Sequence, residues 1–299
     1  MRCDDVTTNV GVSGYFRRCP GAEFEKLTPL PVALSGWGSE HMRGSAVTGA
    51  LARSAENEGR ARRDLRPVRF TADLQRAATM APVSTRSTVV REGGRLLLVD
   101  SEFLQNGHVM ARARTLFLPT TQRVVADPPW SPDRSPSMPP AGLRPATDEG
   151  RLFFSEEHGW SADAAAHQNS ERKQLWCRSI PVVERESVSP FQASATAADL
   201  TNLVTHWGGG GVRHINADVT LTLARFPDGQ SLGLSATGRV GGGAISVGTA
   251  EIYDHRGVFG HTAVSTVLQS GRPVDTITQL MRGSRIELSS GRHGRTEYA

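Results

Sequence analysis

The chain has 299 residues, of which 38% are hydrophobic and 21% charged, a balance typical of a globular protein. It is long enough for two domains of ordinary size, each with its own core. No stretch approaches the roughly 20 apolar residues that a membrane helix needs. The N-terminal segment MRCDDVTTNV carries charges where a signal peptide has its apolar core. We therefore expect a cytoplasmic protein without membrane contact.

The charge and the cysteines exclude further classes of protein. The net charge is +4, but the arginines are scattered and no basic stretch is interleaved with aromatic residues, so we expect no nucleic-acid partner. A solvated arginine-rich surface explains the charge, and an enzyme with a phosphorylated substrate is an alternative. Cys3, Cys19 and Cys177 have no paired spacing and indicate neither a disulfide framework nor a zinc site. We expect no metal ion and no cofactor.

The first half of the chain predicts one helix followed by strands. Residues 41–56 carry apolar side chains at four-residue spacing and predict a helix. Residues 69–75 (RFTADLQ) alternate like a strand and include Asp73. Residues 99–118 predict two strands joined at Asn106-Gly107, a typical hairpin turn. Residues 127–150 are so rich in proline that neither a helix nor a sheet can persist, which predicts a linker.

The second half repeats this order of elements. Residues 189–204 predict a helix, and residues 214–220 (HINADVT) place Asp218 in a strand as Asp73 is placed in the first half. Residues 250–268 predict two further strands with a turn at 254–257. The offset between corresponding segments is about 145 to 150 residues. Three corresponding segments in one order indicate an internal duplication.

The duplication predicts a division of the chain into five parts. These are an N-terminal tail (1–20), a first unit (21–126), the linker (127–150), a second unit (151–270) and a C-terminal tail (271–299). From their charge and turn content we expect both tails to be poorly packed, apart from a short helix around residues 276–281.

Several segments together carry a resemblance to a known family. They are HMRG (41–44), RFTADLQRA (69–77), SPFQASATAADLTNL (189–203), INADVTLTL (215–223) and IYDHRGVFG (252–260). In this order, and in a duplicated chain, they resemble the double hot-dog acyl-CoA thioesterase family over about residues 24–268. The resemblance implies an α+β fold, with two antiparallel sheets each wrapped around a central helix and joined side by side. It also implies hydrolysis of acyl-CoA thioesters.

The resemblance further implies a set of site residues. Members of the family position a water molecule with an aspartate at the start of the second-half strand, a threonine or serine on the next strand, and a glutamine on the last. In this chain the aspartate falls on Asp218, the threonine near Gly238 with Thr237 beside it, and the glutamine on Val264. A carboxylate suits the chemistry, because a thioester needs an oriented water and a group that takes its proton.

Val264 departs from the family pattern, because valine forms no hydrogen bond through its side chain. Gln269 is an odd number of residues away and would lie on the opposite strand face, whereas Thr266 shares the face of Val264. If Asp218 is catalytic, we expect it to line a cavity between the two helices, with Thr237 or Thr266 within about 6 Å. The predicted catalytic residues are Asp218 and Thr237, and the predicted substrate contacts are His41, Gly44, Val264 and Thr266.

Other residues have alternative explanations. Asp199, in the helical motif AAD, is explained by a hydrogen bond that locks helix to sheet, with a role beside the thioester as the alternative. The glycine runs at 208–211 and 241–243 predict hairpin loops rather than phosphate cradles, because no lysine-bearing strand–loop–helix surrounds them. Three arginines of the second half are explained as solvated surface residues, and contact with the phosphates of coenzyme A is the alternative; they are Arg213, Arg225 and Arg239.

A second class of function stays open at this point. The loss of the family glutamine is compatible with a catalytically degenerate hot-dog protein that binds acyl chains or protein partners without turnover. No GxSxG motif surrounds Ser45 or Ser189, which excludes a serine hydrolase of that type. Hot-dog units commonly pair their sheets, so a homo-oligomer is a further alternative, although a duplicated chain supplies such pairing internally.

Overall fold

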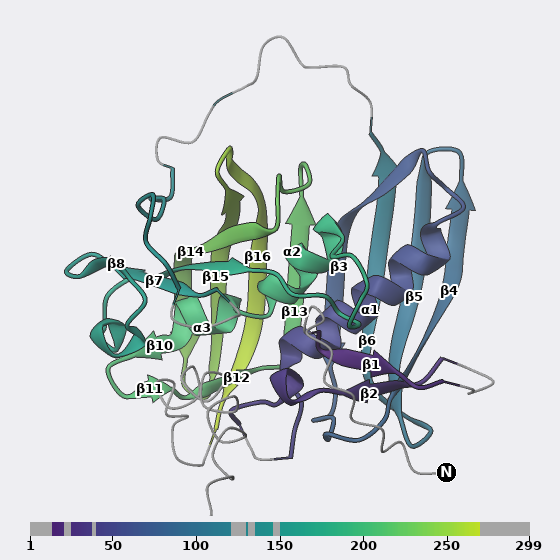
Figure 1. Cartoon of the computed structure of the whole chain (residues 1–299), viewed down its shortest axis with the longest axis horizontal. Helices are drawn as coiled ribbons and strands as arrows, with labels where there is room; N and C mark the ends of the chain where they lie inside the picture. Colours follow the sequence, from purple (N-terminus) through teal and green to yellow (C-terminus); the bar gives the residue numbers. More distant parts are fainter. Residues whose placement is uncertain are drawn as a thin grey trace, which may run out of the picture.

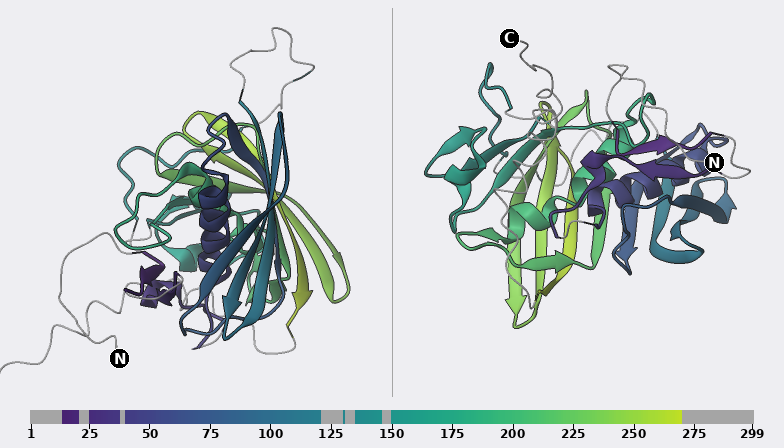
Figure 2. Two further views of the ribbon diagram at one scale, coloured as in Figure 1. Left: turned by 90° about the vertical axis from the view of Figure 1, so that its right-hand side faces the viewer. Right: turned by 60° about the horizontal axis from the view of Figure 1, so that its bottom comes forward.

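A computed structural model describes residues 14–20, 25–37, 40–120, 130, 135–145 and 150–269. One large sheet forms one layer, and the helices lie together against one of its faces (Figure 1). In the left view of Figure 2 the strands fan out on one side of helix α1. No helix in these ranges combines the length and the apolar character needed to cross a bilayer.

The first half places a long helix on a four-stranded sheet; the sequence predicts the helix and three of the strands, and β4 is an addition. Its strands follow the order β4-β5-β6-β3, and the turn at Asn106-Gly107 has φ values of 52° and 78°, as a tight hairpin requires. The elements are β1 (Phe16–Arg18), β2 (Leu27–Pro29), the 3-10 helix η1 (Pro31–Ala33), α1 (Gly44–Gly59), β3 (Leu65–Leu74), β4 (Ser84–Gly93), β5 (Leu96–Gln105) and β6 (His108–Pro119).

The second half has the same plan, but its helix is divided in two. The predicted helix 189–204 consists of α2 (Pro190–Ala198) and α3 (Thr201–His206), with a break at Asp199 and Leu200. The sheet order is β13-β16-β15-β14-β9-β7-β8, and β12 also pairs with β16. The other elements are β7 (Leu152–Ser155), β8 (Gly159–Ser161), η2 (Ala164–His167), β9 (Gln174–Arg178), β10 (Trp207–Gly208), β11 (Gly211–Val212), β12 (His214–Asn216), β13 (Asp218–Leu223), β14 (Ser231–Gly242), β15 (Ile245–Asp254) and β16 (Gly257–Leu268).

The two halves join edge to edge through strands β3 and β13. This pairing is antiparallel, and Asp218 lies opposite Asp73 while Leu221 lies opposite Phe70. It unites both halves into a continuous 12-stranded sheet in which neighbouring strands are antiparallel. The predicted α+β architecture is therefore confirmed, with the refinement that the two sheets form one.

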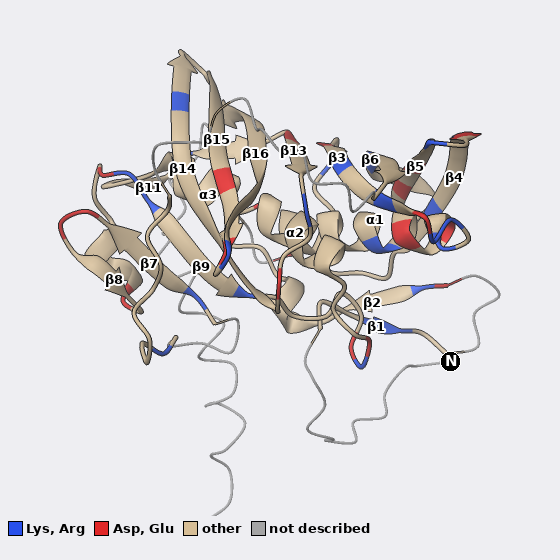
Figure 3. Cartoon of the chain, turned by 90° about the horizontal axis from the view of Figure 1, so that it is seen from above, with Lys and Arg blue, Asp and Glu red and all other residues tan. Residues whose placement is uncertain are grey.

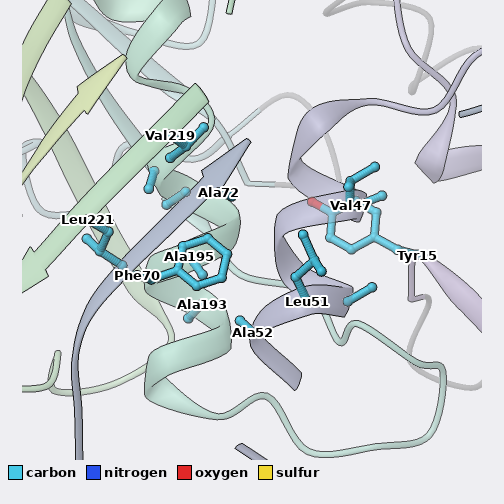
Figure 4. Packing of buried hydrophobic residues seen from close by; sticks show 14 of the residues in the cluster. Tyr15, Val47, Leu51, Ala52, Phe70, Ala72, Ala193, Ala195, Val219 and Leu221 are labelled. Carbon is cyan, nitrogen blue, oxygen red and sulfur yellow. The ribbon is translucent and has the colours of Figure 1, made fainter. Parts of the chain in front are cut away.

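The core fills the space between the helices and the junction strands (Figure 4). Phe70 of β3 and Phe191 of α2 meet edge to face, with ring centroids 6.0 Å apart and planes at 79°. The alanines of α2 keep that helix thin, and a Cβ atom on Gly49 of α1 would lie 2.8 Å from the hydroxyl of Thr196. Small residues thus allow α1 and α2 to approach closely.

Helix α2 begins at a cap that is shared with helix α1. The hydroxyl of Ser189 accepts a hydrogen bond from the backbone N–H of Gln192 (3.0 Å) and donates to the carboxylate of Glu56 (2.6 Å). The side-chain amide of Gln192 donates to the same carboxylate (2.7 Å). Burial raises the pKa of Glu56, and the hydrogen bonds that its carboxylate accepts from the side chains of Ser189 and Gln192 oppose this shift.

Replacing Ser189 by alanine is expected to lower the free energy of unfolding by about 1–2 kcal/mol, because the helix loses its cap and Glu56 loses a donor. Urea denaturation measures this loss. Ser187→Ala, at an exposed site nearby, is the matched control and should change stability little. Equal losses in the two variants would show that the shared cap does not stabilise the protein.

The N-terminal tail is better packed than its sequence indicates. Tyr15 and Phe16 are buried, and the backbone N–H of Phe16 donates to the carbonyl of Val182 (2.9 Å). The prediction of a poorly packed tail is therefore wrong for residues 14–20, because two aromatic side chains supply enough apolar surface to hold this segment. Residues 1–13 and 271–299, including the helix predicted at 276–281, lie outside the described residues.

Candidate active site

A cavity of about 320 Å³ lies where the start of α1 meets the break between α2 and α3. Both halves of the chain contribute to it. Its apolar lining comprises Trp37, Met42, Val47, Leu74, Ala77, Ala78, Ala111, Leu200, Leu203, Val212 and Ile215. Its polar lining includes the arginines Arg43, Arg76 and Arg151 together with Ser45, Asp199, Asn202, Asn216 and Gln269. A pocket that combines apolar walls with convergent polar groups is a usual form of a small-molecule site.

Asp199 is the acidic residue that lines this cavity. It follows the last turn of α2, and its carboxylate accepts hydrogen bonds from the hydroxyl of Ser45 (2.9 Å) and from the side-chain amide of Asn216 (2.9 Å). The sequence-based explanation, a hydrogen bond that locks helix to sheet, is confirmed by the bond to Asn216. The bond to Ser45 adds a contact with the other half of the chain.

The start of α1 is shaped around this carboxylate. A Cβ atom on Gly44 would lie only 2.0 Å from Oδ1 of Asp199, so glycine is needed there. Arg43, the residue that precedes the helix, provides no side-chain cap, and the backbone N–H of Ser45 points to Asp199 instead. Asp199 therefore caps a helix from the opposite half, as the positive end of a helix dipole favours.

Burial raises the pKa of Asp199 above the ordinary value for an aspartate, while the hydrogen bonds from Asn216 and Ser45 and the charge of Arg43 oppose the shift. A carboxylate with a raised pKa is a stronger base than an exposed one once it has lost its proton. Asp199 thus combines a position at a cavity with a raised pKa, a combination that is typical of functional carboxylates.

Asn216 faces the cavity because of an irregularity at Ala217. Asn216 pairs with Thr266, but Thr220, four residues later, pairs with Ala263, only three residues earlier on β16. The strand therefore carries one extra residue, a β-bulge, and the alternation of faces shifts there. Strict alternation along residues 214–220 would place Asn216 and Asp218 on one face, and the bulge places them on opposite faces.

Asp218 points away from the helices. Its neighbour Val219 is fully buried on the helix side, and the Asp218 carboxylate accepts hydrogen bonds from the backbone N–H and the hydroxyl of Ser265. Asp218 does not line the cavity described above. The expectation that it faces a cavity between the helices is therefore wrong, and its part in catalysis stays a prediction.

The other predicted residues are distributed over several places. His41 and Gly44 line the cavity. Val264 is buried in the core, and Thr266 is buried with its hydroxyl donating to the carbonyl of Ser246 (2.8 Å). Thr237 is exposed, and its hydroxyl lies 3.0 Å from that of Thr249. The structure does not bring Thr237 or Thr266 to the cavity of Asp199.

Gln269 lines the cavity although the sequence argument excluded it. Strand β16 ends at Leu268, so the alternation of faces no longer applies to Gln269. The backbone N–H of Gln269 donates to the carbonyl of Arg213 (3.0 Å), which holds the residue at the end of the strand. Gln269 is therefore among the residues at the site, one residue past the end of the strand.

Comparison with solved structures identifies the class of fold. A thioesterase II candidate from Thermobifida fusca is 16% identical, with a TM-score of 0.64, and the match covers 86% of this chain and 98% of that one. An acyl-CoA thioesterase II from Mycobacterium marinum is 16% identical, with a TM-score of 0.56 and coverages of 76% and 90%. A hot-dog protein of unknown function from Alicyclobacillus acidocaldarius is 14% identical, with a TM-score of 0.60 and coverages of 85% and 96%. The chain has the double hot-dog fold.

Family profiles extend this result from fold to family. The acyl-CoA thioesterase N-terminal domain matches residues 34–118, and the acyl-CoA thioesterase C-terminal domain matches residues 119–271. The chain belongs to the acyl-CoA thioesterase family. No curated protein sequence matches it.

Proposed function

We propose that this protein hydrolyses acyl-CoA thioesters and that Asp199 orients and deprotonates the attacking water. The observation that supports this most strongly is the position of Asp199 at a cavity with apolar walls on one part of its surface, with a raised pKa and with hydrogen bonds from both halves of the chain. The family of the chain is in accord with this reaction class.

The proposed reaction uses groups that line the cavity. Water attacks the thioester carbonyl carbon while Asp199 accepts its proton, and the carbonyl oxygen becomes an oxyanion. The side-chain amide of Gln269 is the proposed donor to that oxyanion. The carbon–sulfur bond then breaks, and the proton on Asp199 passes to the leaving thiolate. The products are a carboxylic acid and the free thiol of coenzyme A.

A panel of straight-chain acyl-CoA substrates tests the proposal. The purified chain is expected to release free thiol, because the apolar lining of the cavity favours an acyl group next to the reactive carboxylate. The measurement is the rate of thiol release with a thiol-reactive chromophore, and the substrate without enzyme is the blank. Saturable binding of acyl-CoA without thiol release across the panel would support the non-catalytic alternative instead.

A further inference from the structure

A second cavity of about 500 Å³ lies on the other side of the segment 212–216. It is bounded by the end of α3, the glycine-rich stretch 208–211 and residues 236–239 in the middle of β14. Figure 3 shows β11, α3 and β14 together on one side of the molecule, away from α1 and β4. The charged and titratable residues that line it are Glu171, Arg172, His206, Arg213, His214 and Arg239.

The arginines of this cavity differ from those that form ion pairs elsewhere in the described part of the chain. Arg53, Arg114 and Arg225 each form an ion pair with a carboxylate. Arg172, Arg213 and Arg239 are exposed, and within the described part of the chain their guanidinium groups have no hydrogen bond or ion pair. The acid that faces them is Glu171, whose carboxylate accepts the backbone N–H of Glu157 (3.1 Å). The cavity therefore has an excess of positive charge.

Two histidines add polar groups to the same wall. The rings of His206 and His214 lie 5.1 Å apart between centroids. Burial, together with the charges of His214 and Arg239, lowers the pKa of His206 to about 4. Burial and the charge of Arg239 also lower the pKa of His214. Burial is the first cause of both shifts, and the contribution of Arg239 reflects its positive charge on this wall of the cavity.

The glycine-rich stretch leaves the backbone open to a ligand. A Cβ atom on Gly208 would meet nothing within 4 Å, and Gly211 adopts a φ of 80°. Glycines of this kind let a bound group approach the main chain and its N–H donors closely.

We propose that this second cavity binds a phosphate ester, with Arg213 and Arg239 as its main ligands. Guanidinium groups bind phosphate oxygens through paired hydrogen bonds, and an apolar or neutral ligand would leave these charges without a counter-charge. The phosphate ester has two sources, the nucleotide part of coenzyme A or a free phosphorylated metabolite.

The position of the cavity is compatible with the first source. Val212, Ile215 and Asn216 line the Asp199 cavity, whereas Arg213 and His214 line the second one. Arg213 and Asn216 are three residues apart along extended backbone, which corresponds to about 10 Å. The flexible arm that joins the thioester sulfur of acyl-CoA to its diphosphate exceeds this span. This source rests on the proposed function, but binding of a phosphate ester does not.

Titration calorimetry with adenosine 3′,5′-bisphosphate tests the site itself. The unmodified protein is expected to bind it, and the double variant Arg213→Ala/Arg239→Ala should bind about 10-fold or more weakly. Arg91→Ala, which removes an exposed arginine from β4 in the other half, is the matched control and should bind as the unmodified protein does. No binding by the unmodified protein, or equal affinity in all three proteins, overturns the proposal.

A histidine titration provides a second readout, because a bound phosphate favours the protonated ring. The pKa of His214, followed by nuclear magnetic resonance, is expected to rise when the bisphosphate is added. An unchanged His214 pKa at saturating bisphosphate would show that the ligand binds elsewhere. This measurement does not depend on turnover.

Kinetics with two substrates distinguish the sources. If the phosphates belong to coenzyme A, the double variant should raise the KM for acyl-CoA about 10-fold more than the KM for the matching acyl-pantetheine, which lacks the nucleotide. Loss of bisphosphate binding with equal effects on both substrates assigns the site to a free phosphate ester. If the protein hydrolyses neither substrate, the proposed function fails, and calorimetry still decides whether the second cavity binds phosphate.

Discussion

Replacing Asp199 by asparagine is expected to lower kcat for acyl-CoA by about 100-fold or more, because the variant keeps the shape of the side chain but loses the proton acceptor. The amide can still accept a hydrogen bond from Ser45, so the cap on α1 is partly retained. The measurement is steady-state hydrolysis, with thermal unfolding of both proteins to show that the variant is folded.

Asp218→Asn is the matched control. Both positions carry an aspartate in the second half, but Asp218 lies on the outer face of the sheet and bonds to Ser265. We expect this variant to keep the parent rate. If Asp218→Asn abolishes hydrolysis while Asp199→Asn does not, the sequence-based assignment of Asp218 is right and the cavity beside Asp199 is not the active site.

The raised pKa of Asp199 also predicts a pH dependence. Only the deprotonated carboxylate accepts a proton, so kcat should rise with pH through the pKa of Asp199, above the ordinary aspartate value of about 3.9. The effect on stability has the opposite sign. A raised pKa means that the folded protein holds this proton more tightly than the unfolded chain, so the contribution to stability decreases as pH rises between the two pKa values. Asp199→Asn should remove both dependences.

Replacing Phe191 by alanine is expected to lower the free energy of unfolding by about 3–5 kcal/mol, because the side chain is fully buried and its loss leaves a cavity. The edge-to-face contact with Phe70 is lost as well. Urea denaturation, followed by fluorescence and circular dichroism, measures the effect.

The position of Phe191 also predicts how the protein unfolds. Phe191 belongs to the second half and Phe70 to the first, and the β3–β13 pairing joins the same two halves. We expect one cooperative transition for the whole chain. Phe154→Ala, at a half-exposed site on β7, is the control and should cost less. Two separate transitions, or equal costs for both variants, would contradict a shared core at the junction.

Local patterns in the sequence were sufficient to predict much of the fold. Helix α1, the hairpin at Asn106-Gly107 and the hairpin that turns at residues 254–257 depend on contacts within a short segment, and the structure confirms all three. The duplication supplied the relation between the halves. These features follow from periodicity and turn chemistry, which a single sequence displays directly.

The site could be predicted only in part, because its geometry depends on single-residue irregularities. One extra residue at Ala217 places Asn216 and Asp218 on opposite faces of the sheet. The alternation of apolar and polar residues in the sequence does not reveal this bulge. The break after Ala198 places Asp199 at a helix end, and its contact with Ser45 comes from a segment 154 residues away. The motif AAD was the sequence signal for Asp199. The cavity beside Asp199 is formed by segments far apart in the chain, so the sequence alone does not show it.

Each of the helices α1 and α2 has its start held by a carboxylate near the end of the other. Because both helices belong to one chain, the two contacts can differ in sequence. Asp199 at the end of α2 holds the start of α1, and Glu56 near the end of α1 holds the start of α2. In a dimer of identical chains these two ends would be equal by symmetry, and every substitution would change both. In one continuous chain each end has its own residues. One end can place a carboxylate at a cavity while the other serves as a structural joint, so a substitution at one end leaves the other unchanged.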